Sequence, residues 1–237
     1  MREPRVDAAF VWHDGTRVLS QPKAVLFDFD YTLADSSSAV VDCCNGALAS
    51  MGLRQAAAGD IRRTIGLSIP DTLARLAGEE HRHREPEFRT HWRKRSDVIM
   101  VEQTYLYDEA HTAVAALRER GVAAGIVSTK WRQRIVDVLE RESLIDGFSV
   151  IVGGDNVAEH KPDPEGLLAA AKRLGAAPAE VLYVGDSTTD AQAAGRAGMR
   201  FVAVLSGVTE AHEFDEFEPM RVLPHVGEIG ICLIDAR

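Results

Sequence analysis

Between residues 36 and 107 the apolar residues recur at the three- and four-residue spacing typical of amphipathic helices. No apolar run of strand length interrupts this spacing. The segments that it predicts as helices are 39–51, 57–64, 70–77 and 85–100. We therefore expect residues 36–107 to form a compact, all-helical unit inserted into the chain.

A different pattern begins at residue 112 and also precedes the helical region. Short apolar runs, the kind that forms strands buried on both faces, occur at 24–27, 122–127, 148–152, 181–184 and 201–205. The later runs alternate with helical stretches, several of which end at a glycine. This alternation predicts an α/β fold with a Rossmann-like, doubly wound parallel sheet. The core would comprise residues 23–35 and 108–237, and residues 36–107 would form a small α-helical cap.

The two ends of the chain carry weaker patterns. Residues 1–22 form an N-terminal extension, in which the Asp14-Gly15 pair between apolar residues predicts a hairpin over residues 10–19. Such a hairpin would add to an edge of the fold or contact a second copy of the chain. Residues 228–234 are expected to form a closing helix.

Two carboxylates follow the first predicted strand. Asp28 and Asp30 stand two residues apart, so their side chains share a face if the strand continues. Two acids at the end of a buried apolar strand are unfavourable unless a cation or a shared proton offsets their charge. The sequence therefore predicts a metal, a shared proton, or both at this position.

Polar residues also follow the later strands. In open parallel sheets, ligands bind beyond the carboxyl ends of the strands. Taken singly, each residue has a plain structural explanation, such as a helix cap for Asp186 or a surface lysine for Lys161. Together they predict one polar crevice, and its further members are Ser128, Thr129, Lys161, Asp186 and Asp190.

Composition narrows the class of protein. The 237 residues are 46% hydrophobic and 27% charged, as in an ordinary globular protein. A net charge of -9 disfavours nucleic acid as a partner. The three cysteines are odd in number and lack metal-binding spacing, which suggests a reduced, cytoplasmic protein. We expect neither a membrane span nor a signal peptide.

The residues at the strand ends resemble the four motifs of the haloacid dehalogenase (HAD) superfamily. The first motif corresponds to Val25–Leu33, the second to Ile126–Thr129, the third to Lys161-Pro162 and the fourth to Val184–Asp190. The resemblance covers about residues 23–207, and the helical insertion corresponds to the C1 cap of that superfamily. The amino-acid sequences of these motifs are most similar to those of the phosphoglycolate phosphatase-like branch.

This resemblance implies a Mg²⁺-dependent phosphatase that acts on a small-molecule phosphate ester. Asp28 would be the nucleophile, and Asp30 would donate and then accept a proton. Ser128, Thr129 and Lys161 would hold the phosphoryl group together with Asp28. The resemblance places Mg²⁺ on Asp28, the backbone carbonyl of Asp30 and Asp186, with Asp190 behind these ligands.

The chain departs from the superfamily pattern at Tyr31, where glycine is usual. A tyrosine is strained if the backbone there requires a positive φ, and its ring would narrow the substrate range if it lined the site. The Lys161-Pro162 bond is a candidate cis peptide. Arg62 and Arg63 lie in a stretch of the cap that faces the site in related enzymes.

Several alternatives stay open at this point. A dehalogenase of the same fold would use Asp28 but would need neither a metal nor the acids Asp30, Asp186 and Asp190. A phosphomutase would keep its phosphorylated intermediate long enough to return the phosphoryl group. A non-enzymatic phosphate-binding module would be expected to lack at least one catalytic acid, and none is lacking. The phosphate ester itself and the oligomeric state are not determined by the sequence.

Overall fold

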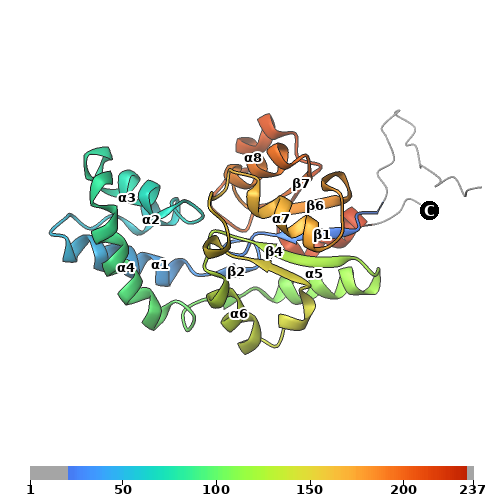
Figure 1. Ribbon diagram of the computed structural model, residues 1–237, viewed down its shortest axis with the longest axis horizontal. Helices are drawn as coiled ribbons and strands as arrows, with labels where there is room; N and C mark the ends of the chain where they lie inside the picture. Colours follow the sequence, from blue (N-terminus) through green and yellow to red (C-terminus); the bar gives the residue numbers. More distant parts are fainter. Residues whose placement is uncertain (1–20, 234–237) are drawn as a thin grey trace, which may run out of the picture.

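A computed structural model describes residues 21–233 of the chain (Figure 1). It consists of a sheet with helices on both faces and a smaller group of helices beside it, at the left of Figure 1. The hairpin predicted over residues 10–19 lies outside the described residues.

The sheet has six strands, and every pairing in it is parallel. In spatial order, the strands are β5 (Val150–Val152), β4 (Ala123–Val127), β1 (Ala24–Phe27), β6 (Val181–Gly185), β7 (Arg200–Val204) and β8 (Arg221–Leu223). The chain therefore builds outward from β1 in one direction through β4 and β5. It then returns to the other side of β1 for β6, which creates a topological switch point.

Both faces of the sheet are covered, as the continuous apolar runs of the strands predicted. Val25 and Phe27 of β1 pack with α5 (Asp108–Glu119) and α6 (Arg132–Arg141). Ala24 and Leu26 point the other way and pack with α7 (Glu165–Arg173) and α8 (Thr188–Ala197). Figure 1 shows the two helix layers above and below the strands. The prediction of a doubly wound α/β fold is confirmed.

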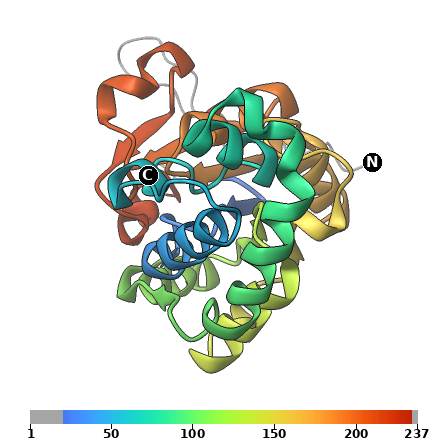
Figure 2. The same cartoon turned by 90° about the vertical axis from the view of Figure 1, so that its left-hand side faces the viewer.

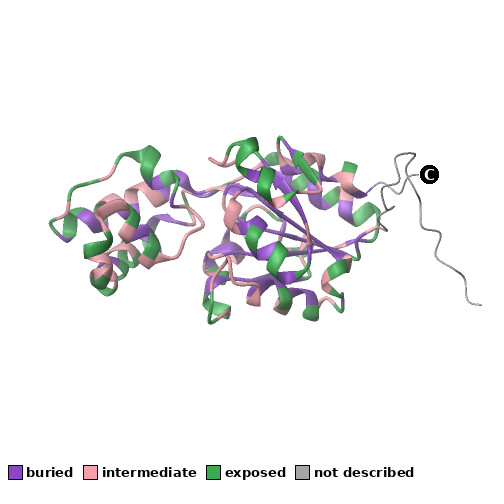
Figure 3. Cartoon of the chain, turned by 90° about the horizontal axis from the view of Figure 1, so that it is seen from above, coloured by how far each residue is buried: buried purple, intermediate pink, exposed green. Residues whose placement is uncertain are grey.

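The inserted unit is helical. It contains α1 (Ser37–Ser50), α2 (Ala58–Arg62), α3 (Ile69–Ala77), the 3-10 helix η1 (Glu79–Arg84) and α4 (Glu85–Ile99). Its apolar faces meet in a core of their own, which includes Leu48, Ile61, Leu73 and Phe88. Figure 2 looks from the side of this unit, with its helices in front of the sheet, and Figure 3 shows that exposed residues cover its outer surface. We refer to this unit as the cap.

Two short strands connect the cap to the core. β2 (Ala34–Asp35) and β3 (Tyr105–Leu106) pair in antiparallel fashion where the chain enters and leaves the cap. Their side chains carry no strand pattern in the sequence, because two residues are too few to show a period. The remaining elements are the 3-10 helices η2 (Ile145–Gly147), η3 (Gly154–Asn156), η4 (Pro178–Glu180), η5 (Ala211–Phe217) and η6 (Val226–Leu233).

The closing helix predicted at the C-terminal end is the 3-10 helix η6 as far as residue 233, and its buried side chains join the core beside α5. Within residues 21–233, no helix combines the length and the apolar character needed to cross a bilayer.

Candidate active site

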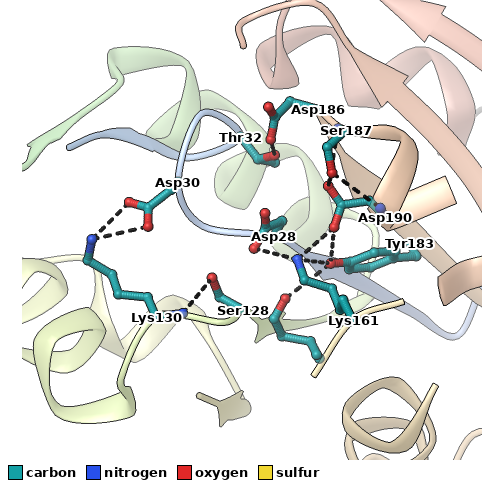
Figure 4. Close-up of polar contacts among 11 residues, drawn as sticks. Asp28, Asp30, Thr32, Ser128, Lys130, Lys161, Tyr183, Asp186, Ser187 and Asp190 are labelled. Atoms are coloured by element: carbon teal, nitrogen blue, oxygen red, sulfur yellow. Dashed lines mark hydrogen bonds and ion pairs between the residues drawn. The ribbon is translucent and has the colours of Figure 1, made fainter. Parts of the chain in front are cut away.

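The site lies at the carboxyl ends of the three central strands. Asp28 directly follows β1, Ser128 follows β4 and Asp186 follows β6. Because β1 pairs with both β4 and β6, these three positions are neighbours at one edge of the sheet. Figure 4 shows their side chains converging with Lys161 and Asp190 from the loop before α7 and from α8. The structure thus brings together the residues that the sequence placed at separate strand ends.

Lys161 occupies the centre of this group. Its Nζ lies 2.9 Å from Asp28 Oδ1 and 2.6 Å from Asp190 Oδ1, and its side chain is only 5% exposed. The ammonium also donates to the hydroxyl of Tyr183 at 3.0 Å. One buried cation therefore links the acid at the end of β1 to the acid on α8.

Asp190 is held by several donors at once. Its Oδ2 accepts hydrogen bonds from the hydroxyl of Ser187 at 2.6 Å and from the Ser187 backbone N–H at 3.1 Å, in a capping box at the start of α8. Its Oδ1 faces Lys161 and the hydroxyl of Tyr183, which lies 3.0 Å away. The Asp190 side chain is fully buried, and both of its carboxylate oxygens accept hydrogen bonds. It is therefore suited to orienting Lys161 and Tyr183.

Tyr183 is a member of the site that the sequence did not reveal. It lies within β6, is fully buried, and its hydroxyl is 3.1 Å from the carbonyl of Val127 at the end of β4. The hydroxyl therefore connects β4 with Lys161 and Asp190. A tyrosine in an apolar strand resembles a core residue by pattern, and only the tertiary contacts show its polar role.

The protonation of these groups reflects their burial. Burial raises the pKa of Asp28 to about 6, and the nearby Lys161 ammonium opposes this rise. Burial, together with the charges of Asp190 and Asp28, raises the pKa of Asp186 well above its ordinary value. Burial opposes the charged form of Lys161, but the carboxylates of Asp190 and Asp28 outweigh it and raise its pKa.

The acids fit a divalent cation that binds through oxygen. Among the described residues, Asp28, Asp186 and Asp190 offer carboxylate oxygens that all lie within 4.8 Å of one another. Asp28 Oδ1 is buried and receives no well-oriented hydrogen bond, although Lys161 is at ion-pair distance. Asp186 accepts one hydrogen bond, from Thr32 at 3.2 Å. Carboxylate oxygens are ligands that Mg²⁺ prefers. A cation here would also offset the burial and mutual repulsion that raise the pKa values of Asp28 and Asp186.

Gly207 leaves room for this cluster. A Cβ atom at this position would lie 2.1 Å from Asp186 Oδ2, closer than any real contact allows. A side chain at residue 207 would therefore displace Asp186. Residue 207 must lack a side chain because its backbone passes directly over the Asp186 carboxylate.

Asp30 points away from Asp28 and toward Lys130 (Figure 4). Its two oxygens accept hydrogen bonds from Lys130 Nζ at 2.9 and 3.1 Å, and Oδ1 also accepts one from the Ser36 hydroxyl at 2.7 Å. The Lys130 side chain is only 6% exposed. Lys130 is therefore buried in an ion pair with Asp30.

The second motif lies beside this pair. Ser128 is buried, and its hydroxyl accepts a hydrogen bond from the backbone N–H of Lys130 at 3.3 Å. Thr129 lines the space between the core and the cap. Both residues therefore lie at the edge where a ligand could reach Asp28.

Two local backbone features match the sequence analysis. Tyr31 has a φ of 61°, so a tyrosine does occupy the left-handed conformation that favours glycine. Its ring is buried and is not among the residues that line the space under the cap, so nothing supports a narrowing of the site by this ring. The Lys161-Pro162 peptide is cis.

A cavity of about 570 Å³ separates the site from the cap. Asp30, Lys130 and Lys161 face it from the core, and the segment from Thr64 to Thr72 faces it from the cap. Arg62 and Arg63 are exposed and do not line it. The residues that line it also include Trp92, Arg93, Trp131, Arg134, Asp155 and Glu159.

Comparison with known proteins agrees with this geometry. The model of the family described as haloacid dehalogenase-like hydrolase matches residues 25–204. A phosphoglycolate phosphatase of Nitrosococcus oceani is 28% identical over 225 residues, which are 92% of this chain and 100% of that protein. A phosphoglycolate phosphatase of Xanthomonas campestris is 33% identical over 190 residues, covering 78% of this chain and 84% of the relative.

Solved structures give the same result. The crystal structure of a protein named as a haloacid dehalogenase-like hydrolase, from Bacteroides fragilis, superposes with a TM-score of 0.85 at 40% identity. The match covers 88% of this chain and 100% of that one. The family model alone spans most of the sequence and contains every strand end that forms the site. The chain therefore belongs to the haloacid dehalogenase-like hydrolases and is a phosphatase of that family.

Proposed function

We propose that this phosphatase hydrolyses a small-molecule phosphomonoester, with Asp28 as the nucleophile that attacks phosphorus. The observation that carries the proposal is the meeting of Asp28, Lys161 and Asp186 at the switch point of the sheet. A carboxylate is a competent nucleophile for phosphoryl transfer once positive charge offsets the repulsion between two anions. Lys161 provides such charge at 2.9 Å from the attacking carboxylate.

Two steps complete the reaction. In the first, an oxygen of Asp28 bonds to phosphorus, the ester P–O bond breaks, and Asp30 gives its proton to the departing alkoxide. In the second, water attacks phosphorus and loses a proton to Asp30, and the bond between Asp28 and phosphorus breaks to release inorganic phosphate. Asp30 suits both steps because it lines the cavity through which alcohol and water pass.

The phosphoryl oxygens have partners at this edge of the sheet. We assign them to Ser128, Thr129 and Lys161. Ser128 and Thr129 directly follow β4, and Figure 4 shows Ser128 and Lys161 beside Asp28. Tyr183 and Asp190 orient Lys161 through their contacts with its ammonium. The phosphoryl group would thus be held by residues of the core, and the alcohol part of the ester would extend toward the cap.

We assign Mg²⁺ to Asp28, the backbone carbonyl of Asp30 and Asp186, because both oxygens of Asp190 already have donors. When bound, the ion supplies positive charge that brings nucleophile and phosphate together. We also propose that residues 36–107 form the cap, that residues 23–35 and 108–237 form the catalytic core, and that the protein is cytoplasmic. The free thiols of Cys43, Cys44 and Cys232 agree with a reducing compartment.

Phosphoglycolate is the first substrate to test, since the two relatives above carry that name. The test is a phosphatase screen over glycolate, sugar and nucleotide phosphates, with and without Mg²⁺. It compares the wild type, Asp28→Asn and a control, Asp146→Asn, which changes an exposed carboxylate outside the site. We expect Mg²⁺-dependent phosphate release by wild type and control, and at least a 1,000-fold loss in Asp28→Asn.

Other outcomes would identify the alternatives. Halide release from 2-haloacids without Mg²⁺ would indicate a dehalogenase. A stable phosphorylated chain that passes its phosphoryl group to a sugar phosphate would indicate a phosphomutase. Tight binding of phosphate without turnover of any ester would indicate a binding module and would overturn the proposed function.

A further inference from the structure

Lys130 is a lysine that lies beside Asp30 and is shut off from solvent. Its side chain is 6% exposed, and that of Asp30 is 12% exposed. Because its Nζ lies 2.9 Å from Oδ1 and 3.1 Å from Oδ2 of Asp30, one ammonium donates to both oxygens of the carboxylate. Lysines are almost never buried unless they are paired. The partner of Lys130 is the acid that transfers protons in the proposed reaction.

Both members of this pair are also fixed from other sides. The Lys130 ammonium lies 5.8 Å from the ring centre of Phe29, within the range of a cation–π contact. The backbone N–H of Lys130 donates to Ser128 Oγ at 3.3 Å. Asp30 Oδ1 accepts a second hydrogen bond from the hydroxyl of Ser36, which is buried where the cap begins. The Asp30 carboxylate is therefore held in one place between the loop after β4 and the start of the cap.

Two lysines divide the acids Asp28 and Asp30 between them. Lys161 lies 2.9 Å from Asp28, whereas Lys130 forms its ion pair with Asp30. Figure 4 shows Asp30 turned toward Lys130, on the opposite side of Asp28 from Lys161 in that view. A carboxylate without Lys130 would be attracted to the Lys161 ammonium or to a bound Mg²⁺. Lys130 thus keeps Asp30 apart from the cations that serve Asp28.

This separation suits proton transfer to the departing alcohol. In phosphoryl transfer the attacking and leaving oxygens lie roughly in line, on opposite sides of phosphorus. An acid that serves the leaving oxygen must therefore stand away from Asp28 by the width of a phosphoryl group. Asp30 and Lys130 both line the cavity into which the alcohol part of the ester would extend.

We propose that Lys130 is a positioning residue for Asp30, and that its ammonium holds the carboxylate beside the leaving oxygen without touching the phosphoryl group. Oδ1 of Asp30 has two donors, Lys130 and Ser36, so Oδ2 is the oxygen that carries the proton. This inference rests on the proposed function, because the proton transfers concerned are those of Asp30. Loss of Lys130 should impair both proton transfers and leave the attack of Asp28 on phosphorus intact.

The experiment compares two esters that differ in their need for a proton. An alkyl ester, phosphoglycolate or the best alkyl ester of the screen, releases an alkoxide that must be protonated. The aryl ester 4-nitrophenyl phosphate releases a stable nitrophenolate that leaves without a proton. Hydrolysis of the phosphorylated Asp28 requires Asp30 with either ester. The value of kcat/KM covers only the steps up to phosphoryl transfer, whereas kcat also includes this hydrolysis.

Lys130→Met should therefore separate the two esters. We expect kcat/KM for the alkyl ester to fall by about 30-fold or more, since general acid catalysis contributes about 100- to 10,000-fold. For the aryl ester, kcat/KM should change by less than about threefold while kcat falls by about 30-fold. Rapid mixing should then show a burst of about one nitrophenolate per chain before slow turnover. Lys130→Arg, which keeps the charge, should recover part of the alkyl ester activity.

Two controls keep the test independent of folding defects. Lys172→Met makes the same change at an exposed lysine of α7 and should match the wild type with both esters. The double variant Lys130→Met, Asp30→Asn leaves no unpaired charge behind. Because Lys130 acts through Asp30, the double variant should lose no more than about threefold beyond Asp30→Asn alone.

Three results would overturn the inference. They are an equal loss of kcat/KM for both esters in Lys130→Met, a rise in KM alone, and a double variant far less active than Asp30→Asn. The first two would mean that Lys130 supports the fold or binds the phosphoryl group. All three would leave the proposed function intact as long as Asp28→Asn is inactive. A wild type that hydrolyses neither ester would contradict both.

Discussion

Replacing Asp28 with asparagine should change how the stability of the metal-free protein depends on pH. Burial raises the pKa of Asp28 from 3.8 to about 6. The folded chain therefore binds a proton at this carboxyl more tightly than the unfolded chain does. The stability that this proton contributes is fully present at pH values below 3.8 and is lost as the pH rises through about 6.

The size of the effect follows from the shift. A shift of about two units corresponds to roughly 3 kcal/mol over the whole titration, and about 1.4 kcal/mol of it falls between pH 5 and pH 7.5. The fully buried position of Asp28 leaves little solvent screening to reduce this value. Since the charge of Asp28 also raises the pKa of Asp186, the asparagine variant should lose at least this much pH dependence.

Urea unfolding in EDTA at pH 5, 6 and 7.5 measures this directly. The free energy of unfolding of wild type should fall by about 1.4 kcal/mol more than that of Asp28→Asn between pH 5 and 7.5. Asp146→Asn, which changes an exposed acid of the core, should follow the wild type. Parallel pH profiles for wild type and Asp28→Asn, within about 0.5 kcal/mol, would refute the electrostatic account of the site.

Three further predictions concern the same cluster. At pH 7.5, Mg²⁺ at 100 times its dissociation constant should raise the free energy of unfolding of the wild type by about 2.7 kcal/mol. The same Mg²⁺ concentration should raise the free energy of unfolding of Asp186→Asn much less. An equal gain in both proteins would contradict the metal assignment. Tyr183→Phe removes the hydroxyl that donates to the buried Val127 carbonyl, so urea unfolding should show that the free energy of unfolding falls by about 1–3 kcal/mol. Because the same hydroxyl contacts Lys161, phosphatase assays should show a lower kcat with little change in KM. An unaltered kcat would mean that the hydroxyl does not position Lys161. Gly207→Ala places a Cβ against Asp186 and should weaken Mg²⁺ binding by about tenfold or more in calorimetry, whereas wild-type affinity would show that Asp186 can move without loss.

The strands and the cap helices follow from local pattern. The run Ala24–Phe27 is entirely apolar and is buried on both faces, so these four residues were enough to predict the strand β1. The strand β8 was not predicted, because Arg221–Leu223 is short and its first two residues are exposed. Residues at strand ends converge in any parallel sheet, which is why Asp28 and Asp186 could be expected to meet.

The tertiary contacts that complete the site could not be predicted from the local sequence pattern. Lys130 and Asp30 lie 100 positions apart, and Tyr183 resembles an ordinary core residue of β6. Arg134 occupies a helical position where a solvent-facing arginine is the usual expectation, and its burial depends on Trp92 from the cap. Such contacts are set by how segments far apart in the sequence pack against one another, which no local pattern encodes.

The central claim is that Asp28 carries the phosphoryl group during turnover, and mapping that group tests it most directly. Wild-type protein is mixed with Mg²⁺ and the best substrate of the screen, quenched in acid within milliseconds, digested with pepsin at low pH and examined by mass spectrometry. The account predicts one added phosphoryl group on the peptide that contains Asp28, and none in Asp28→Asn. A phosphoryl group on any other residue, or full turnover by Asp28→Asn, would contradict it.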